Sequence, residues 1–431
     1  MARILVTSAG YLGDVLPFVS VARELAGRGH EIDLVVPSGF HDSFANEPVT
    51  LHRLGVEFSP RELFGVHRDK WDRYGTGLGA ARMTRWMLRE GMLEHVDSIY
   101  DSLATVADEA DLVFTHNVIV PARWTAELHD IPCVTLPVVP TLVPSEQRLP
   151  GMRPMPAFPG RVGRRVNRAA WAGAMRAMEL VFAADVRPLR EGRRRLGLPE
   201  HRNELLTNKD TSDRLLLPVS PHWFPRPSDW PETTVLTGFI PWEPPGSELA
   251  DDVTAFLDGG TPPILVTLST SAATNAHQVF ELLANTLDEL GLRGLFLVGD
   301  ESNVSEPLRC RPGVWPFVPL HLVLPRCRAV VHSASLGTTA AVLETGLPSL
   351  AIPLLFDQIW NAHRTAQLRA GLVLRHPSRP RARRRVDQLV SNRTLEAHAR
   401  DLSARLRSEH GAARAADTIE GALERRGGVS C

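Results

Sequence analysis

The chain has 431 residues, which suffices for two large domains or three of ordinary size. Hydrophobic residues make up 43% and charged residues 23%, so the composition excludes wholesale disorder. The 48 basic and 49 acidic residues leave a net charge of -1. This balance argues against a dedicated nucleic-acid-binding protein, because such a protein needs a clustered positive excess.

The four cysteines lie far apart, with neither metal-ligand nor redox spacing, and are expected to be reduced. The first residues lack the apolar stretch of a signal peptide. No apolar run approaches the roughly 18 residues that a transmembrane helix needs. We therefore expect a cytoplasmic location.

The first part of the chain predicts an open α/β sheet. Arg3–Ser8 is a short apolar run typical of a buried strand, and helical apolar spacing follows from Val15 to Ala26. Glu31–Ser38 is the next strand, and this strand–helix–strand unit implies a parallel sheet. Two further strands are expected, Leu112–Thr115 and Cys133–Leu136.

Residues 140–200 depart from this alternation. They are rich in proline at first, and Pro150–Arg202 then holds twelve arginines and four acidic residues, a local charge of +8. Helical spacing covers Ala169–Phe182, and the whole insertion is too long for a simple connector, so we expect a lid or substrate loop. Arg161–Arg195 could contact an anionic membrane, but a solvated face is favoured, because all but two of the basic residues in this chain are arginine.

A second α/β pattern follows a Pro-rich linker that begins at Ile240. The expected strands are Ile264–Leu268, Gly294–Val298, Ala329–His332 and Leu350–Pro353. The expected helices are Ala276–Leu290, about Thr338–Thr345 and Trp360–Ala370. Arg393–Arg426 is expected to form one charged, Ala-rich helical stretch. The plan is two doubly wound domains with a cleft between them, and ligands in such sheets bind beyond the carboxyl ends of the strands.

The most informative window is 330–358. A strand ends at His332, small and hydroxylated residues follow, and a helix opens at Gly337-Thr338. The free N–H groups and positive dipole end of this helix form an anion site that suits a diphosphate. An ordinary helix start with small residues for packing is the alternative.

Asp357 and Gln358 follow the next strand at the same sheet edge. A carboxylate beside an amide suits hydrogen bonding to the vicinal hydroxyls of a sugar. Asp357 as a simple helix cap is the alternative, and the local sequence does not separate the two.

These residues resemble the donor-binding signature of family 1 glycosyltransferases with the GT-B fold, roughly His-His-Gly-Gly-x-Gly-Thr-Thr, Gly-x-Pro and Pro-x-x-x-Asp-Gln. The start of the chain, Gly13-Asp14-Val15-x-Pro17-Phe18 with Arg28-Gly29-His30-Glu31, is similar to a Gly-Asp-Val-x-Pro subgroup that includes antibiotic-aglycone and sterol glycosyltransferases. Phe224–Pro231 and Phe317–Cys327 resemble further blocks in the family's order. The resemblance covers nearly the whole chain.

The resemblance implies two Rossmann-like doubly wound domains that face a cleft. Residues 1–238 would form an acceptor-binding domain and residues 249–395 a nucleotide-sugar-binding domain. Residues 239–248 would be the linker between them, and residues 396–431 a helical tail.

The resemblance also implies roles for particular side chains. Asp14 would be the catalytic base, although it could equally cap the first helix, and both roles can coexist. Donor contacts are implied for Thr270, Val318, Pro319, Ser333, Ser335, Gly337, Thr338, Asp357 and Gln358. Weaker supporting positions are His116, Asn117 and His332.

The chain departs from the family pattern where a second histidine usually touches the diphosphate. Ser333 stands there, and Ala334-Ser335 replaces the glycine pair. Losing a charge-assisted contact weakens leaving-group stabilisation by about 1.5–3 kcal/mol. Another cation would have to compensate, or the enzyme would be slow or inactive.

The resemblance therefore implies an inverting glycosyltransferase that moves a sugar from a UDP- or TDP-sugar to a hydroxyl of an apolar small molecule such as a polyketide, sterol or glycolipid. No cofactor and no metal are expected, because the sequence has no Asp-x-Asp motif. The alternatives are a non-catalytic nucleotide-sugar-binding auxiliary homologue and a nucleotide-sugar epimerase on the same fold. A nicotinamide enzyme is disfavoured, because Gly10-x-x-Gly13 is not the dinucleotide fingerprint.

Overall fold

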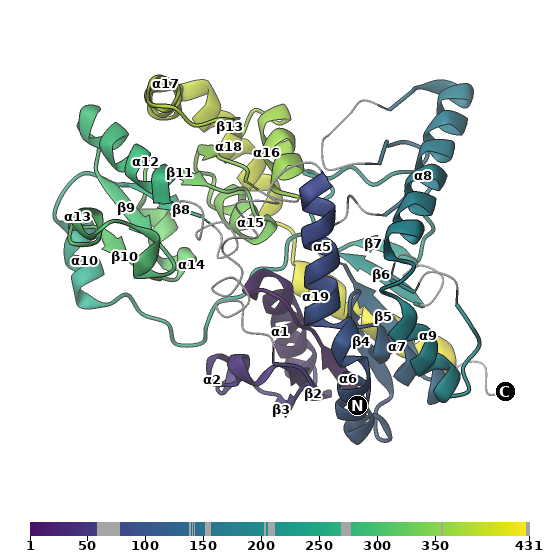
Figure 1. The fold of residues 1–431 in the computed structure, drawn as a ribbon. Coiled ribbons are helices and arrows are strands. Elements are labelled where there is room, and N and C mark those ends of the chain that lie inside the picture. The colour runs from purple at the N-terminus through teal and green to yellow at the C-terminus, as the bar shows by residue number, and fades with distance from the viewer. Residues whose placement is uncertain are drawn as a thin grey trace.

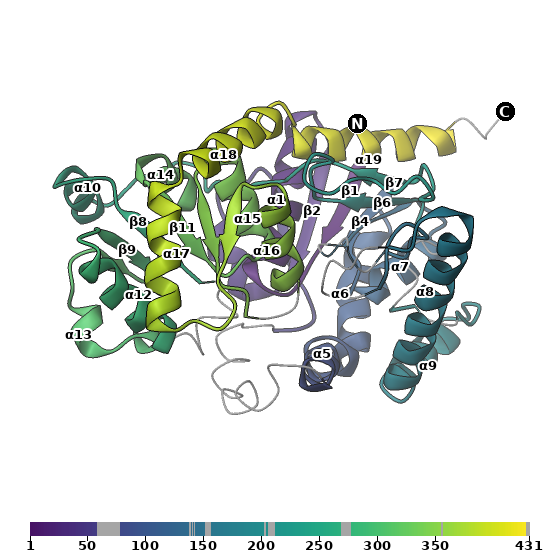
Figure 2. The ribbon, with the colours of Figure 1, turned by 90° about the horizontal axis from the view of Figure 1, so that it is seen from above.

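The computed structural model describes residues 1–57, 78–137, 143–150, 157–201, 212–268, 277–354 and 357–427, together with residues 139, 141, 204 and 205. Within these residues the chain forms two parallel sheets, one in each half (Figure 1). Each sheet carries helices on both faces, as Figure 2 shows from a second direction.

The first sheet has the strand order β3-β2-β1-β4-β5-β6-β7, and every neighbouring pair is parallel. Its strands are β1 (Arg3–Thr7), β2 (Glu31–Val36), β3 (Thr50–Arg53), β4 (Leu112–His116), β5 (Cys133–Leu136), β6 (Arg214–Leu217) and β7 (Thr234–Leu236). Its helices are α1 (Leu12–Gly27), α2 (His41–Phe44), α5 (Leu78–Gly91), α6 (Val96–Ala107), α7 (Val120–Leu128), α8 (Gly160–Phe182) and α9 (Arg187–Arg195).

The second sheet repeats this arrangement with the order β10-β9-β8-β11-β12-β13. Its strands are β8 (Ile264–Thr267), β9 (Gly294–Leu297), β10 (Val314–Trp315), β11 (Ala329–His332), β12 (Ser349–Ala351) and β13 (Gly371–Val373). Its helices are α10 (Asp251–Asp258), α12 (His277–Glu289), α13 (Glu306–Arg309), α14 (Leu320–Val323), α15 (Leu336–Thr345), α16 (Gln358–Gln367) and α17 (Arg379–Ser391). The predicted pair of doubly wound α/β sheets is thereby confirmed.

The central strands are apolar along their length because helices cover both faces of each sheet. In β1, Ile4, Leu5 and Val6 are completely buried, and α1 packs Val15 and Phe18 against this sheet. The strand order reverses beside β1 and β4 in the first sheet and beside β8 and β11 in the second. A ligand site is expected beyond the carboxyl ends of these strands.

The single helix expected over Arg393–Arg426 is wrong. The chain forms α18 (Arg393–Leu406), turns, and continues as α19 (Gly411–Gly427), so the helical stretch is broken at residues 407–410. At the start of α19 the chain passes close to the linker: a Cβ on Gly411 would lie 2.0 Å from the carbonyl oxygen of Phe239, so a residue without a side chain is needed there.

Helix α19 returns to the first sheet and completes its core. Ala415, Ala416 and Ile419 are fully buried in the same cluster as Val15 and Phe18 of α1. In Figure 2, α19 lies over the strands of the first sheet and not over those of the second.

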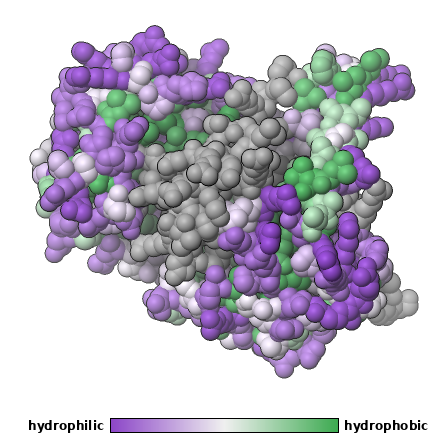
Figure 3. Space-filling model, viewed as in Figure 1, coloured by the Kyte–Doolittle hydropathy of each residue, from purple (hydrophilic) through white to green (hydrophobic). Residues whose placement is uncertain are grey.

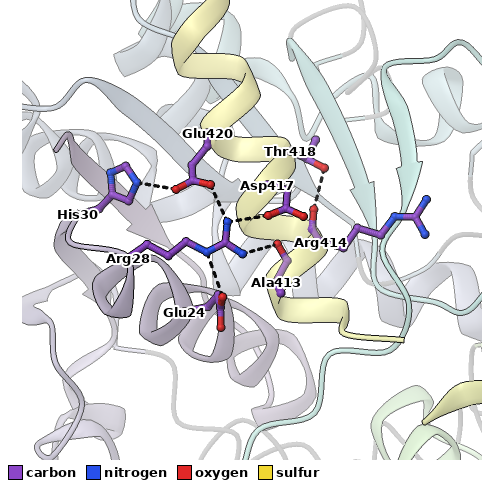
Figure 4. A network of polar contacts seen from close by, with 8 residues as sticks. All are labelled: Glu24, Arg28, His30, Ala413, Arg414, Asp417, Thr418 and Glu420. Atoms are coloured by element: carbon purple, nitrogen blue, oxygen red, sulfur yellow. Dashed lines mark hydrogen bonds and ion pairs between the residues drawn. The ribbon is translucent and has the colours of Figure 1, made fainter. Parts of the chain in front are cut away.

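A polar network holds α19 in this place (Figure 4). Arg28 donates to Asp417 at 2.7 Å, to Glu420 at 2.6 Å and to the carbonyl of Ala413 at 3.1 Å, and His30 lies 3.0 Å from Glu420. The Arg28-Gly-His30 segment, which resembles the family pattern in sequence, therefore anchors the C-terminal helix to the N-terminal domain.

Candidate functional site

Asp14 lies in the first turn of α1, directly after the loop that follows β1. It is the third residue of the helix rather than its N-cap, which is Tyr11. Its Oδ2 accepts the backbone N–H of Tyr11 at 2.8 Å. The carboxylate thus satisfies one exposed donor of the helix start, as the capping alternative expected, although from a position further into the helix.

The loop before Asp14 is built around one glycine. Gly10 has φ +126°, and a Cβ there would lie 2.5 Å from Asp14 Oδ2. Any other residue at this position would push the carboxylate away, so Gly10 lets the loop close over Asp14.

The acidity of Asp14 is strongly altered. Burial raises its pKa to about 7, the hydrogen bond from Tyr11 opposes this rise, and the charge of Asp357 adds to it. Because Asp357 belongs to the second sheet, the two carboxyl groups, one from each half of the chain, lie within electrostatic reach of one another. The structure therefore brings together two residues that the sequence placed 343 positions apart.

Asp357 directly precedes α16, and burial raises the pKa of its carboxyl to about 6. Its Oδ2 accepts the side-chain amide of Asn361 at 2.7 Å. The neighbouring Gln358 is buried, and its Oε1 accepts the backbone N–H of Leu354 at 3.0 Å.

Asn361 is a residue that sequence analysis missed. It is buried, and its Nδ2 donates both to Asp357 and, at 3.0 Å, to the carbonyl oxygen of Ala334. It thereby ties the loop after β11 to the start of α16. The sequence did contain a signal for Asn361, because Asp357 and Asn361 are four residues apart and therefore share one helix face.

Ala334 has the left-handed value φ +66°, in the place where the family pattern carries a glycine. Its N–H donates to Nδ1 of His332 at 3.2 Å. Burial lowers the pKa of His332 to about 4, so the ring is neutral at pH 7 with its proton on Nε2. That Nε2 is buried and has no hydrogen-bond partner among the residues the structure describes.

Helix α15 begins at Leu336, two residues before the predicted start, with Ser335 as its N-cap. No acidic residue stands in its first turn, and the Ser335 side chain makes no capping bond to the backbone but donates to Thr338 Oγ1 at 3.0 Å. Gly337 is exposed in this turn. The first turn of α15 therefore presents backbone N–H groups and hydroxyls without a carboxylate.

The remaining predicted donor residues divide into three groups. Ser333 and Val318 are buried, Val318 in an apolar cluster of the second domain. Pro319 is half-buried as the N-cap of α14. Thr270 lies outside the described residues.

Phe317, which sequence analysis did not select, is 67% exposed just after β10 and directly before Val318. It lies at the carboxyl edge of the second sheet, where ligands of such sheets bind. The sequence did offer a signal, because Phe317 is the first residue of the block Phe317–Cys327 that resembles the family pattern.

His116 ends β4 and contacts the Phe18 ring edge-on, with ring centroids 5.8 Å apart. Burial lowers its pKa to about 3, and neither ring nitrogen has a partner in the described parts of the chain. The carbonyl of Asn117 accepts a hydrogen bond from Arg123 at 2.9 Å. Across the described residues, no three His, Cys, Asp or Glu side chains are arranged to hold a metal ion.

Residues 300–421 match the family model described as the C-terminal domain of erythromycin biosynthesis protein CIII-like proteins. The O-mycaminosyltylonolide 6-deoxyallosyltransferase of Streptomyces fradiae is 25% identical over 437 residues, covering 98% of each chain. Sterol 3-beta-glucosyltransferase UGT80A2 of Arabidopsis thaliana is 24% identical over 83% of this chain and 55% of its own length.

Solved glycosyltransferases share the whole architecture. The glycotransferase of kitacinnamycin superposes with a TM-score of 0.70 at 19% identity, covering 98% of this chain and 99% of the other. Glycosyltransferase VinC, solved in complex with dTDP, superposes with a TM-score of 0.67 at 18% identity and covers 98% and 100%. With its two doubly wound sheets, this chain has the GT-B fold and is a glycosyltransferase related to antibiotic and sterol glycosyltransferases.

Proposed function

We propose that this glycosyltransferase moves a sugar from a UDP- or TDP-sugar to a hydroxyl of an apolar small molecule, with inversion at the anomeric carbon and without a metal. The observation that carries the proposal is the juxtaposition of Asp14 and Asp357, which belong to opposite domains. Relatives named for tylonolide and sterol acceptors support the acceptor class, and a relative solved with dTDP supports the donor class.

In the proposed mechanism, Asp14 accepts the proton of the acceptor hydroxyl as the sugar is displaced. A pKa of about 7 suits a general base better than the ordinary aspartate value, because a base works best near the operating pH. It remains far below the pKa of an alcohol, so proton transfer has to be concerted with departure of the nucleotide.

The departing diphosphate would be held at the first turn of α15. The N–H groups near Gly337 and the hydroxyl of Thr338 supply donors there, and no carboxylate competes for them. Ser333 is buried, so the backbone of α15 would carry more of this stabilisation than the side chain that replaces the family histidine.

The rest of the donor would lie along the edge of the second sheet. Phe317 offers an exposed ring for the nucleobase, and Val318 and Pro319 follow it directly in the chain. Asp357 would accept from sugar hydroxyls, with Gln358 and Asn361 fixing the local backbone. In this scheme residues 1–238 bind the acceptor and residues 249–395 bind the donor, with Thr270 as a further phosphate contact.

The test is Asp14→Asn, which keeps the shape of the side chain and its bond from Tyr11. We expect kcat to fall about a hundredfold or more, as is typical for loss of a general base, while the thermal shift caused by UDP or TDP persists. Asp42→Asn, in the first turn of α2, is the matched control and should leave kcat unchanged. Unchanged turnover in Asp14→Asn would remove Asp14 from the role.

Product analysis separates transfer from its alternatives. A panel of nucleotide sugars is incubated with and without hydroxylated apolar acceptors, and the products are identified. A glycosylated acceptor, or slow release of free sugar, supports a transferase. Conversion of the donor to a stereoisomer would instead establish an epimerase, and donor binding with neither reaction would establish an auxiliary protein.

A further inference from the structure

Helix α8 exposes apolar side chains on the face that points away from the protein. Val162 is 73% exposed, Val166 45% and Leu180 66%. Their spacing places all three on one face of the helix. Figure 3 shows hydrophobic residues gathered along α8 on this side of the molecule.

The opposite face of α8 is fastened to the domain by polar contacts. Asn167 is completely buried and its Nδ2 donates to the carbonyl of Glu146 at 2.8 Å, while Trp171 Nε1 donates to the carbonyl of Arg148 at 2.8 Å. A surface helix ordinarily turns its apolar stripe inward and its polar face outward. Here the outer face carries large apolar residues, so ordinary solvation does not account for it.

A further exposed aromatic ring stands just before the helix and is held in position. Phe158, 54% exposed, precedes the helix, and its backbone N–H and C=O are both bound by the side chain of Asn167, at 3.2 and 3.1 Å. A Cβ on Gly163 would lie 2.3 Å from the carbonyl oxygen of Phe158, so this glycine lets the segment fold back onto the helix. The exposed ring therefore lies on a fixed backbone.

Positive charge flanks the apolar face. The helix contains five arginines and a single acidic residue. Arg168 pairs with Glu146 and Arg176 with Glu179. Arg161 and Arg165, which helical spacing places beside the apolar face, are exposed and form no ion pair within the part of the chain that the structure describes.

We propose that α8 docks this enzyme onto an anionic lipid surface. Phe158, Val162, Val166 and Leu180 would enter the boundary between headgroups and acyl chains, and the two unpaired arginines would face the anionic headgroups. A second copy of this chain is a poor occupant, because two such faces would bring their arginines together. No described helix is long and apolar enough to cross a membrane, so the contact would be peripheral.

This docking would serve the proposed transfer of a sugar to an apolar acceptor, and the purpose given to it here rests on that proposed function. Helix α8 belongs to the half of the chain assigned to the acceptor and lies on its side away from the second sheet (Figure 1). Apolar acceptors concentrate in membranes, so docking would bring that half to its substrate. Vesicle binding is measured without donor or acceptor, so its failure is distinguishable from failure of the proposed transfer reaction.

The experiment is co-sedimentation of the full-length protein with vesicles of phosphatidylcholine alone or with about 30% phosphatidylglycerol. We expect binding to the anionic vesicles that weakens as salt is added. Arg161→Gln with Arg165→Gln should lower the partition coefficient about tenfold or more, as should Val162→Ser with Leu180→Ser. Arg383→Gln with Arg384→Gln, an exposed pair on α17, is the matched control and should have no effect.

The proposal would be overturned if the protein did not bind anionic vesicles at low salt. It would also be overturned if the α17 control lost as much binding as the α8 variants. A monomer–dimer equilibrium that the α8 variants abolish, measured by sedimentation velocity, would assign the face to a second copy instead. Circular dichroism confirms that the variants are folded, which is expected because every substituted side chain is exposed.

Discussion

The loop after β1 and the loop after β11 each follow a strand beside the point where the strand order reverses, yet they open their helices in opposite ways. In α1 a carboxylate, Asp14, occupies the helix start and accepts its N–H at Tyr11. In α15 the first turn holds Gly337 and Thr338 and no acid. The first helix start is filled by its own anion, whereas the second is available for an anionic ligand.

In the proposed mechanism, this difference lets one strand–loop–helix module serve two chemical tasks. Filling the helix start with Asp14 places a base at the edge of the first sheet, where burial raises its pKa. Leaving the α15 start without an acid provides positive potential at the edge of the second sheet. The starts of α1 and α15 would then match what a displacement reaction needs, with a proton acceptor on one side and stabilisation of the leaving group on the other.

Among changes that leave both carboxyl groups in place, the largest expected effect comes from disturbing the first loop. Gly10→Ala places a Cβ against Asp14 Oδ2 at a φ that alanine avoids, so we expect a loss of about 1–3 kcal/mol in the free energy of unfolding and at least a tenfold fall in kcat. Urea denaturation and initial rates measure these. Gly13→Ala, where a Cβ would meet nothing within 4 Å, is the control, and an equal loss there would contradict the account.

The second loop is tested through Asn361. Asn361→Ala removes the donor shared by Asp357 and the carbonyl of Ala334, so the donor KM should rise about tenfold, in line with loss of a buried hydrogen bond. Asn303→Ala is matched to it, since Asn303 is buried and donates to the carbonyl of Val298 at 2.9 Å far from this loop. The control should lose stability without a change in donor KM.

A third prediction concerns the coupling between the two loops. Activity should fall as the pH drops through about 7, because Asp14 must be ionised to act as a base. Asp357→Asn removes a negative charge near Asp14, so the pKa of Asp14 should fall and the acidic limb of the kcat/KM profile should move to lower pH. An acidic limb that stays in place in this variant would show that the two carboxyl groups are not coupled.

The smallest expected effect lies at the other end of α15. Burial raises the pKa of Glu344 to about 7, so the folded state holds a proton that the unfolded state releases near pH 4.5, and stability should decline as pH rises from about 4.5 to 7. Glu344→Gln should flatten this decline and add about 1 kcal/mol at pH 8. Denaturation curves at pH 5 and pH 8 measure it, with exposed Glu248→Gln as the control.

Much of the fold followed from sequence because the central strands are buried on both faces. Strands β5 and β11 have the predicted bounds, and β1 and β8 differ by one residue at their ends. The short strands β3, β6, β7, β10 and β13 were missed, because two to four residues carry little periodicity. The break before α19 was also missed, and the close approach of Gly411 to Phe239 at this point is a long-range contact that no local pattern encodes.

The site was less accessible from sequence. Asp14 and the α15 start were found through motif spacing, but the electrostatic contact of Asp14 with Asp357 depends on how the two domains pack. Asn361 was missed for a similar reason, because its buried amide joins two segments of the chain. The exposed apolar face of α8 was hidden in a region where arginine dominates the composition.

The most direct test of the central claim is a crystal structure of the enzyme soaked with UDP or TDP. The account predicts density for the diphosphate against the backbone N–H groups around Gly337 and Thr338, within reach of Asp357 and across from Asp14. Density for the diphosphate elsewhere, or none at saturating ligand, would contradict it.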